Sequence, residues 1–274
     1  MKILRGKTAA VTGAASGLGR AMALAFADEG MDLALADVDE KGLQETLQLV
    51  KGVKASSMRV DVAKAAEVDA FAASLKNVHV VCNNAGVSPL GPVWENTTAD
   101  WQWALGVNLW GVIHGVRAFV PRLLAQGEGH VINTASVAGL ISPPGMGIYN
   151  VTKHAVVTLS ESLYQDLRVQ GSPVGVSVLC PAYVPTGISD SERNRPKDLK
   201  NSSKMSSQQE VLAQQLRKAV SSGKLSADDV ARAVVAAVKE DRFYILTHPR
   251  IKGAIQARME DILAERAPRN PLAL

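Results

Sequence analysis

Residues 8–19, Thr-Ala-Ala-Val-Thr-Gly-Ala-Ala-Ser-Gly-Leu-Gly, carry the pattern that decides the fold. Residues 8–12 are mostly apolar and end at a glycine, which predicts a buried strand. Residues 18–28 then repeat apolar side chains at helical spacing. Glycines allow a tight turn between the two, and the free N–H groups at the start of a helix suit a pyrophosphate. The Gly-x-x-x-Gly-x-Gly spacing in this context predicts a dinucleotide site. Its expected contacts are Gly13, Ser16, Gly17, Leu18 and Gly19.

The alternation of strands and helices continues along most of the chain and predicts the fold class. Residues 33–36 form the next apolar run, and a helical pattern follows from residue 40. Further strands are predicted at residues 57–60, 78–81, 130–134, 174–179 and 243–246. Strands separated by helices indicate βαβ units with right-handed crossovers. We therefore expect one α/β domain over residues 1–274, with a Rossmann-type, doubly wound parallel sheet of about seven strands and helices on both faces.

Two segments depart from this regular pattern. Residues 189–223 begin with charged and polar side chains and follow a predicted strand. We interpret them as a substrate lid, the alternative being a surface loop without a special role. Residues 248–274 extend beyond the last strand, and apolar side chains recur in them at helical spacing. They are predicted to form a C-terminal helical extension.

Composition excludes several classes of protein. The 274 residues are 47% hydrophobic and 20% charged, which excludes a disordered chain and a coiled-coil rod. The net charge of +4 is not concentrated in a basic run, so nucleic acid is not an expected partner. The sequence contains no apolar stretch typical of a membrane-spanning segment and no ligand spacing typical of a metal site, so neither is predicted. Cys82 and Cys180 lie in apolar stretches, which fits reduced thiols in the cytoplasm.

Asp37, at the end of the second predicted strand, indicates which dinucleotide is preferred. It follows Gly19 by 18 residues, where an acid accepts hydrogen bonds from the adenosine ribose hydroxyls. Its carboxylate would also repel a 2′-phosphate, so it favours NAD over NADP. Asp37 could instead cap the next helix, as Asp39 could. Arg20 leaves NADP open, because a nearby arginine can hold the 2′-phosphate.

Tyr149 and Lys153, four residues apart, form the second chemical motif. On a helix this spacing puts both side chains on one face. An ammonium beside a phenol stabilises the phenolate and lowers the tyrosine pKa, so the phenol can act as a general acid or base near neutral pH. Taken alone, the spacing occurs by chance in many proteins.

Together, the glycine pattern and the Tyr-x-x-x-Lys motif resemble the short-chain dehydrogenase/reductase family. Residues 82–86, Cys-Asn-Asn-Ala-Gly, are similar to the family's segment after the fourth strand. Ser136 lies 13 residues before Tyr149, which is the family spacing for the catalytic serine. Asn108, within Val-Asn-Leu, matches the helix asparagine of the family's catalytic tetrad.

The resemblance implies a tetrad of Ser136, Tyr149, Lys153 and Asn108. It also implies cofactor contacts from Asp61, Val62, Asn84, Ala85, Gly86, Pro181, Val184 and Thr186, and from Tyr149 and Lys153 themselves. In the family mechanism, the tyrosine exchanges the substrate proton and the lysine lowers its pKa and binds the nicotinamide ribose. The serine holds the substrate oxygen, and the asparagine holds a water that connects the lysine to solvent. A homo-oligomer, either a tetramer or a dimer, is implied as well.

The candidate substrate contacts are mostly apolar. They are Trp94, Ile141, Met146, Tyr183 and Ile188. No clear clamp for an anion accompanies them, although Arg193 and Arg195 of the lid could reach in. We therefore expect an uncharged, hydrophobic secondary alcohol or ketone. The lid and the C-terminal extension also resemble those of bacterial aryl-alcohol dehydrogenases that oxidise lignin-derived aryl ethers.

Two alternative functions stay open. One is an NADP-dependent ketone or acyl reductase of the same family, against which Ser16, Asp37 and Val38 argue. The other is a catalytically silent regulator that senses nucleotides, against which the complete tetrad argues.

Overall fold

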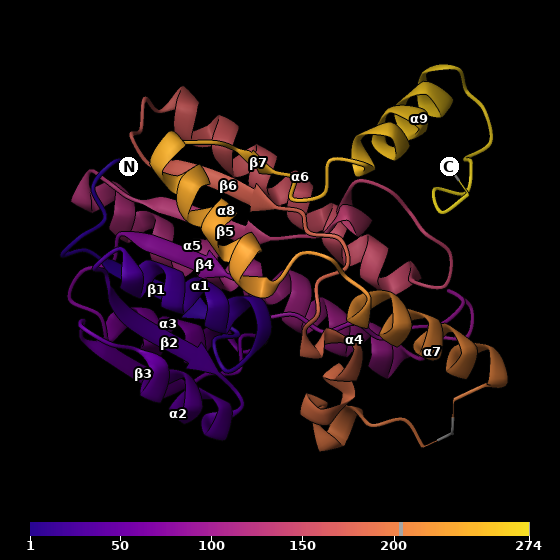
Figure 1. Ribbon diagram of the computed structural model, residues 1–274, viewed down its shortest axis with the longest axis horizontal. Coiled ribbons are helices and arrows are strands. Elements are labelled where there is room, and N and C mark those ends of the chain that lie inside the picture. Colours follow the sequence, from indigo (N-terminus) through magenta and orange to yellow (C-terminus); the bar gives the residue numbers. More distant parts are fainter. Residues whose placement is uncertain (203–204, 274) are drawn as a thin grey trace.

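The computed structural model describes residues 1–202 and 205–273 and contains a seven-stranded parallel sheet (Figure 1). The strands lie in the order β3-β2-β1-β4-β5-β6-β7. Their bounds are β1 (Thr8–Thr12), β2 (Asp32–Asp37), β3 (Ala55–Arg59), β4 (Val80–Asn83), β5 (His130–Thr134), β6 (Gly175–Leu179) and β7 (Tyr244–Ile245). The predicted doubly wound Rossmann-type sheet is confirmed, and the predicted strands differ from the observed ones only at their ends.

Helices cover both faces of the sheet (Figure 1). One face carries α1 (Gly17–Asp28), α2 (Glu40–Leu49) and α8 (Ala227–Glu240). The other carries α3 (Ala65–Ala73), α5 (Gly111–Gln126) and α6 (Gly147–Val169). Before α5 come α4 (Thr98–Leu105) and a π-helical turn, Gly106–Trp110.

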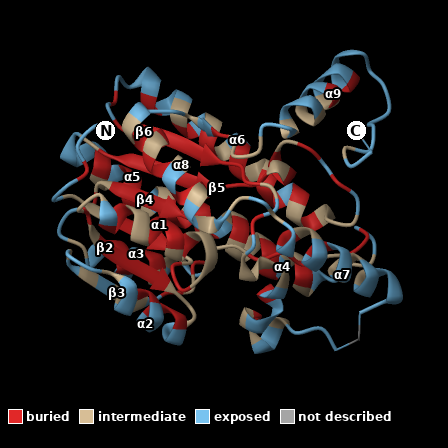
Figure 2. Cartoon of the chain, in the orientation of Figure 1, coloured by how far each residue is buried: buried red, intermediate tan, exposed pale blue. Residues whose placement is uncertain are grey.

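The strands form because their apolar side chains are buried on both faces. In β1, Ala9 and Val11 join the core under α1 and α8, while Ala10 joins the core under α3 and α5. Successive side chains of a strand point to opposite faces, so a short, continuously apolar run fills both layers. Figure 2 shows the resulting buried band through the centre of the molecule.

The strand order reverses direction between β1 and β4, and this positions the site. β1 pairs with β2 on one side and with β4 on the other. In an open parallel sheet, the loops leaving two such strands diverge and open a crevice at the carboxyl ends. Here these loops begin at Gly13 and Asn84.

Residues 189–223 and 248–274 form two additions to the sheet and its helices. A 3₁₀ turn at Gly187–Asn194 leads into the first, which also contains a 3₁₀ turn at Lys197–Leu199 and the helix α7 (Ser207–Ser221), with Ser203 and Lys204 outside the described residues. The second contains α9 (Ile251–Leu263), which stands away from the sheet in Figure 1; Leu274 lies outside the described residues. Within residues 1–202 and 205–273, no helix combines the length and apolarity needed to cross a membrane.

A buried histidine at the start of β5 should make stability sensitive to acid. His130 is fully buried, and its Nε2 lies 2.7 Å from the Ser177 hydroxyl. Burial lowers the pKa of His130 to about 4, with the Asp241 carboxylate acting in the opposite direction. Because the folded pKa lies below the unfolded one, the stabilisation is present above pH 6.5 and is lost as pH falls through that value towards 4.

We expect His130→Gln to remove this dependence. Between pH 7 and pH 5 the wild-type free energy of unfolding should fall by about 2 kcal/mol more than that of the variant. Urea unfolding at a series of pH values measures the difference. Parallel pH curves for the two proteins would contradict the assignment to His130.

Candidate active site

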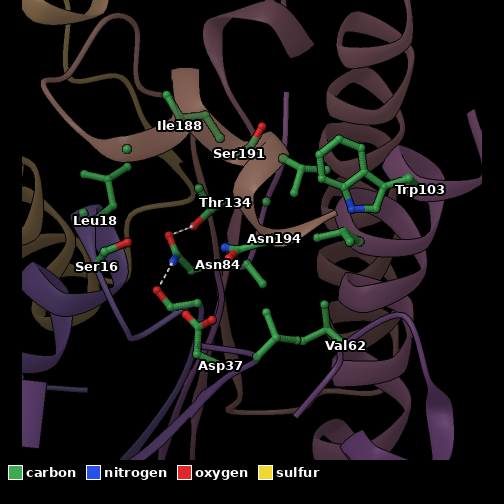
Figure 3. Close-up of a pocket in the computed structure, with 18 of the residues that line it drawn as sticks. Ser16, Leu18, Asp37, Val62, Asn84, Trp103, Thr134, Ile188, Ser191 and Asn194 are labelled. Carbon is green, nitrogen blue, oxygen red and sulfur yellow. Dashed lines mark hydrogen bonds between the residues drawn. The ribbon is translucent and has the colours of Figure 1, made fainter. Parts of the chain in front are cut away.

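A cavity of about 570 Å³ lies at the carboxyl ends of the strands. Its lining joins the turn after β1, the ends of β4 and β5, and the segment that follows β6 (Figure 3). It includes these predicted cofactor contacts: Gly13, Ser16, Gly17, Leu18, Asp37, Asp61, Val62, Asn84, Ala85, Gly86, Tyr149, Lys153, Pro181, Val184 and Thr186. Gly19 does not line the cavity; it is buried behind the turn.

The glycine turn packs so closely against its neighbours that larger side chains would not fit there. Gly13 and Gly17 have φ values of +67° and +53°, where other residues are strained. A Cβ at Gly13 would lie 2.8 Å from the Ala85 Cα, and one at Gly19 would overlap the Gly13 carbonyl. Gly13 and Gly17 also line the cavity, and α1 starts there with no acidic residue in its first turn. This arrangement fits an anion such as a pyrophosphate.

Asp37 lies at the cavity wall and is held by the backbone. Its carboxylate accepts the Ala15 N–H at 3.0 Å and the Asp39 N–H at 3.0 Å. Asp39, and not Asp37, caps α2, because its carboxylate accepts the Gly42 N–H at 3.0 Å. The remaining acceptor capacity of Asp37 faces the cavity, as the lining and Figure 3 indicate.

Arg20 is turned away from this site. Its guanidinium donates to the Thr46 hydroxyl at 2.9 Å and to the Ala15 carbonyl at 2.5 Å. It also pairs with Glu45 at 3.0 Å. Arg20 therefore joins α1 to α2 and is absent from the residues that line the cavity.

Asn84 ties the turn after β1 to the ends of β4 and β5. Its N–H donates to the Thr12 hydroxyl at 2.9 Å, and its amide nitrogen donates to the Thr12 carbonyl at 3.0 Å. The Thr134 hydroxyl donates to the amide oxygen at 3.3 Å (Figure 3). These bonds fix the glycine turn against the strands that lead to the remaining site residues.

Ser136, Tyr149 and Lys153 meet in the same cavity. Ser136 follows β5, and its hydroxyl donates to the Pro181 carbonyl at 3.3 Å. Tyr149 and Lys153 lie one turn apart on α6, with the Lys153 Nζ 5.5 Å from the tyrosine ring centroid. The Lys153 Nζ donates to the Thr134 carbonyl at 2.8 Å. The helix therefore brings together the pair that its spacing predicted.

Burial changes the acidity of this pair. It raises the pKa of Tyr149 to about 12, and a hydrogen bond with Ser136 only partly offsets this rise. Burial also lowers the pKa of Lys153 to about 8. The net lowering of the tyrosine pKa expected from sequence is therefore not found, because removing the phenolate from water outweighs the stabilising groups around it.

Asn108 lies in the π-helical turn between α4 and α5 and is fully buried. Its amide oxygen accepts the Val87 N–H at 2.8 Å, and its amide nitrogen donates to the Val87 carbonyl at 2.9 Å. The same nitrogen donates to the Thr152 hydroxyl at 3.1 Å. Asn108 thus connects the loop after β4 to α6, beside Lys153. Single π-helical turns often occur at functional sites.

The predicted substrate contacts do not gather at one place. Ile188 lines the cavity, whereas Trp94 is 83% exposed and Ile141 is 2% exposed. Met146 precedes α6, and Tyr183 follows β6; neither is in the cavity lining. Ser191, Asn194, Leu199 and Val220 of the predicted lid form part of the wall, and so do three residues that sequence reasoning did not select: Gln102, Trp103 and Val107.

Trp103 shows what sequence reasoning missed. Trp103 was not among the candidate substrate contacts, but it lines the cavity while being 2% exposed. Its position five residues before Asn108 on one helical stretch was the available signal.

A buried ion pair holds the segment after β6 against α4. The Arg195 Nη2 lies 2.7 Å from the Asp100 Oδ1, with the two side chains only 3% and 6% exposed. The guanidinium carbon lies 4.9 Å from the Trp103 ring centroid. Burial raises the pKa of Asp100, but hydrogen bonds from the Thr97 N–H, Arg195 and Asn201 lower it below its ordinary value. Arg195 is therefore bound to Asp100. It does not reach into the cavity, which is the possibility that the sequence had left open for it.

Comparison with known proteins agrees with this geometry. Residues 7–197 match the family model described as short chain dehydrogenase. The chain belongs to this family. The resemblance drawn from the glycine turn, Tyr149 and Lys153 is thereby confirmed.

Three proteins show how far the similarity to other short-chain dehydrogenases extends. The CLA biosynthesis dehydrogenase/reductase of Lactiplantibacillus plantarum is 34% identical and covers 98% of this chain and 97% of its own. The C alpha-dehydrogenase of Sphingobium sp. is 28% identical over 98% of this chain and 89% of its own. A short-chain dehydrogenase/reductase from Burkholderia phymatum, solved in complex with NAD, is 50% identical, covers 100% of both chains and has a TM-score of 0.98.

Proposed function

We propose that this short-chain dehydrogenase transfers a hydride between NAD(H) and an uncharged, hydrophobic secondary alcohol or ketone. One observation carries the proposal: a single cavity is lined both by the glycine turn with Asp37 and by Ser136 with Tyr149 and Lys153. A dinucleotide site and a proton-transfer site therefore share one space.

The lining fits NAD. Gly13 and Gly17 of the glycine turn line the cavity, and the Asp37 carboxylate is positioned to accept ribose hydroxyls. Arg20, the residue that could have favoured NADP, is committed to Thr46, Ala15 and Glu45. The relative from Burkholderia phymatum was solved with NAD, which supports the same choice here.

Tyr149 is the proposed proton carrier. NAD, when bound, supplies the hydride acceptor, and NADH the donor. The Tyr149 phenol donates a proton to a carbonyl oxygen during reduction, and the phenolate takes the hydroxyl proton during oxidation. Because burial raises the pKa of Tyr149, the phenol predominates at neutral pH, and oxidation becomes faster as the pH rises.

Ser136, Lys153 and Asn108 support this transfer. The Ser136 hydroxyl can donate to the substrate oxygen and stabilise its developing charge. Lys153 places an ammonium 5.5 Å from the phenol ring, which favours the phenolate. Asn108 fixes the Val87 backbone against α6 and is the proposed start of the water path from Lys153 to solvent.

The substrate is proposed to enter beneath residues 189–223, acting as a lid. The wall on that side includes the apolar side chains of Trp103, Ile188, Leu199 and Val220, beside the charged side chains of Arg193 and Asp198. Such a wall favours an uncharged hydrophobic ligand with a few placed polar groups. A homo-oligomer is part of the proposal as well, supported by the half-exposed Trp110 and by the apolar residues that α9 leaves exposed.

Cofactor titration of the wild type and of Asp37→Ala tests the proposal. The wild type should bind NAD more tightly than NADP, and should form NADH with neutral secondary alcohols. Asp37→Ala should lose roughly tenfold or more in NAD affinity, because a charged acceptor for the ribose hydroxyls is removed, and far less in NADP affinity. Calorimetry measures the four dissociation constants, those of NAD and NADP for the wild type and for Asp37→Ala.

Asp32→Ala is the matched control, because Asp32 lies at the other end of β2 and only binds the Lys54 N–H. It should leave both affinities unchanged. Equal losses of NAD and NADP in Asp37→Ala would remove the ribose assignment. A wild type that binds neither cofactor would refute the proposed function.

A further inference from the structure

Four cationic side chains line the cavity, and they differ in how they are neutralised. Arg59 pairs with Glu67 at 3.4 Å, and Lys64 pairs with Glu67 at 3.2 Å. Lys153 is buried beside Tyr149 and donates to a backbone carbonyl. Arg193 pairs with no carboxylate in the part of the chain that the structure describes.

Arg193 is nevertheless held in place. One of its terminal nitrogens, Nη1, donates to the Gly187 carbonyl at 2.7 Å and to the Asp190 carbonyl at 3.0 Å. A guanidinium has five N–H donors, so those on Nε and Nη2 stay available. Two residues further on, the Arg195–Asp100 pair fixes the chain to α4. The Arg193 guanidinium is thus an exposed positive charge without a carboxylate partner among the described residues, on a segment of backbone that the Arg195–Asp100 pair holds in place.

The chain around Arg193 contacts the glycine turn. A Cβ on Gly17 would lie 3.1 Å from the Thr186 Cβ, so Thr186 sits directly over the start of α1. A Cβ on the next residue, Gly187, would lie 3.1 Å from the Arg193 Nη2. Thr186 contacts the glycine turn, and the next residue, Gly187, contacts the Arg193 guanidinium. The guanidinium therefore lies on the same side of the cavity as the glycine turn. The glycine turn itself offers backbone N–H groups but no cationic side chain.

We propose that Arg193 binds the pyrophosphate of the dinucleotide, and that the described residues 187–199 thereby close on the cofactor as well as on the substrate. This inference rests on the proposed dinucleotide function and adds a contact to it. A pyrophosphate carries two negative charges, and a guanidinium binds phosphate oxygens through paired, charge-assisted hydrogen bonds. Cofactor binding then orders the lid before the substrate enters. A substrate carboxylate is the competing partner for Arg193, and the experiment separates the two.

The test compares ADP-ribose with adenosine, because only ADP-ribose contains the pyrophosphate. Binding to the wild type and to Arg193→Gln is measured by calorimetry, with adenosine measured by competition. The variant should lose roughly tenfold in ADP-ribose affinity and nothing in adenosine affinity. Arg193→Lys should recover part of the loss, since it restores the charge without the paired donors. The ADP-ribose complex should also protect residues 187–199 from limited proteolysis in the wild type more than in the glutamine variant.

Arg217→Gln is the matched control. Arg217 lies on α7 and pairs with Asp190 at 3.3 Å, but it does not line the cavity. The Arg217→Gln variant should bind ADP-ribose with the same affinity as the wild type. An unchanged ADP-ribose affinity in Arg193→Gln, or an equal loss in Arg217→Gln, would overturn the inference. If the wild type itself bound neither ADP-ribose nor NAD, the proposed function would fail together with it.

Discussion

Tyr149→Phe should lose about a thousandfold or more in turnover while its NAD affinity stays within about twofold of the wild type. Only the phenolic oxygen is removed, so the ring still fills its half-buried position on α6. The oxygen is the atom that donates and accepts the substrate proton in the proposed mechanism. Steady-state turnover with a neutral secondary alcohol, together with NAD calorimetry, measures both effects.

Tyr164→Phe is the control for this result, because Tyr164 lies on the same helix and packs against Phe243 with ring centroids 5.1 Å apart. Its turnover should match the wild type. The pH profile adds a second criterion: wild-type oxidation should rise with pH, since burial raises the pKa of Tyr149, and residual oxidation in Tyr149→Phe should not. Near-normal turnover in Tyr149→Phe would remove Tyr149 as the proton carrier.

Arg195→Met should lower the free energy of unfolding by about 4 kcal/mol, which is the second large effect. The Asp100 carboxylate would stay buried without its cation, although Thr97 and Asn201 still donate to it. Methionine keeps an apolar stem against Trp103, so the change acts mainly through charge. Urea unfolding measures the loss. Because Trp103 lines the cavity, the substrate KM should rise as well.

Arg217→Met provides the comparison for Arg195→Met. The Arg217–Asp190 pair is 56% and 62% exposed, and such surface pairs contribute less than about 1 kcal/mol. Adding Asp100→Asn to Arg195→Met should recover part of the stability, because no uncompensated charge is then buried. Equal effects of the two arginine substitutions would contradict the role given to the buried pair.

Features that depend on neighbours in the sequence were predictable. The strand, the glycine turn and the helix after it are contiguous, and their local geometry follows from residue type. Tyr149 and Lys153 share a face of α6 because four residues make about one helical turn. Asp37 ends β2 as its place after the apolar run predicted.

Features that depend on distant partners were not predictable. Arg20 was open to a 2′-phosphate by sequence, but its contacts with Thr46 and Glu45 on α2 turn it away. Trp94 looked suited to an apolar pocket, yet it is 83% exposed. Nothing in the spacing of one helix says which remote side chain will pack against it.

The sequence by itself determined the doubly wound sheet, the glycine turn and the placing of Tyr149 and Lys153 on one helix face, because periodicity and turn chemistry act over a few residues. Ser136 and Asn108 were implied by the family resemblance. The tertiary structure alone decided that Arg195 is paired with Asp100 and that Arg193 carries a charge without a carboxylate partner among the described residues. It also decided that burial raises the pKa of Tyr149. Burial and ion pairing arise from packing between elements that are far apart in the chain, and only the folded arrangement of those elements sets them.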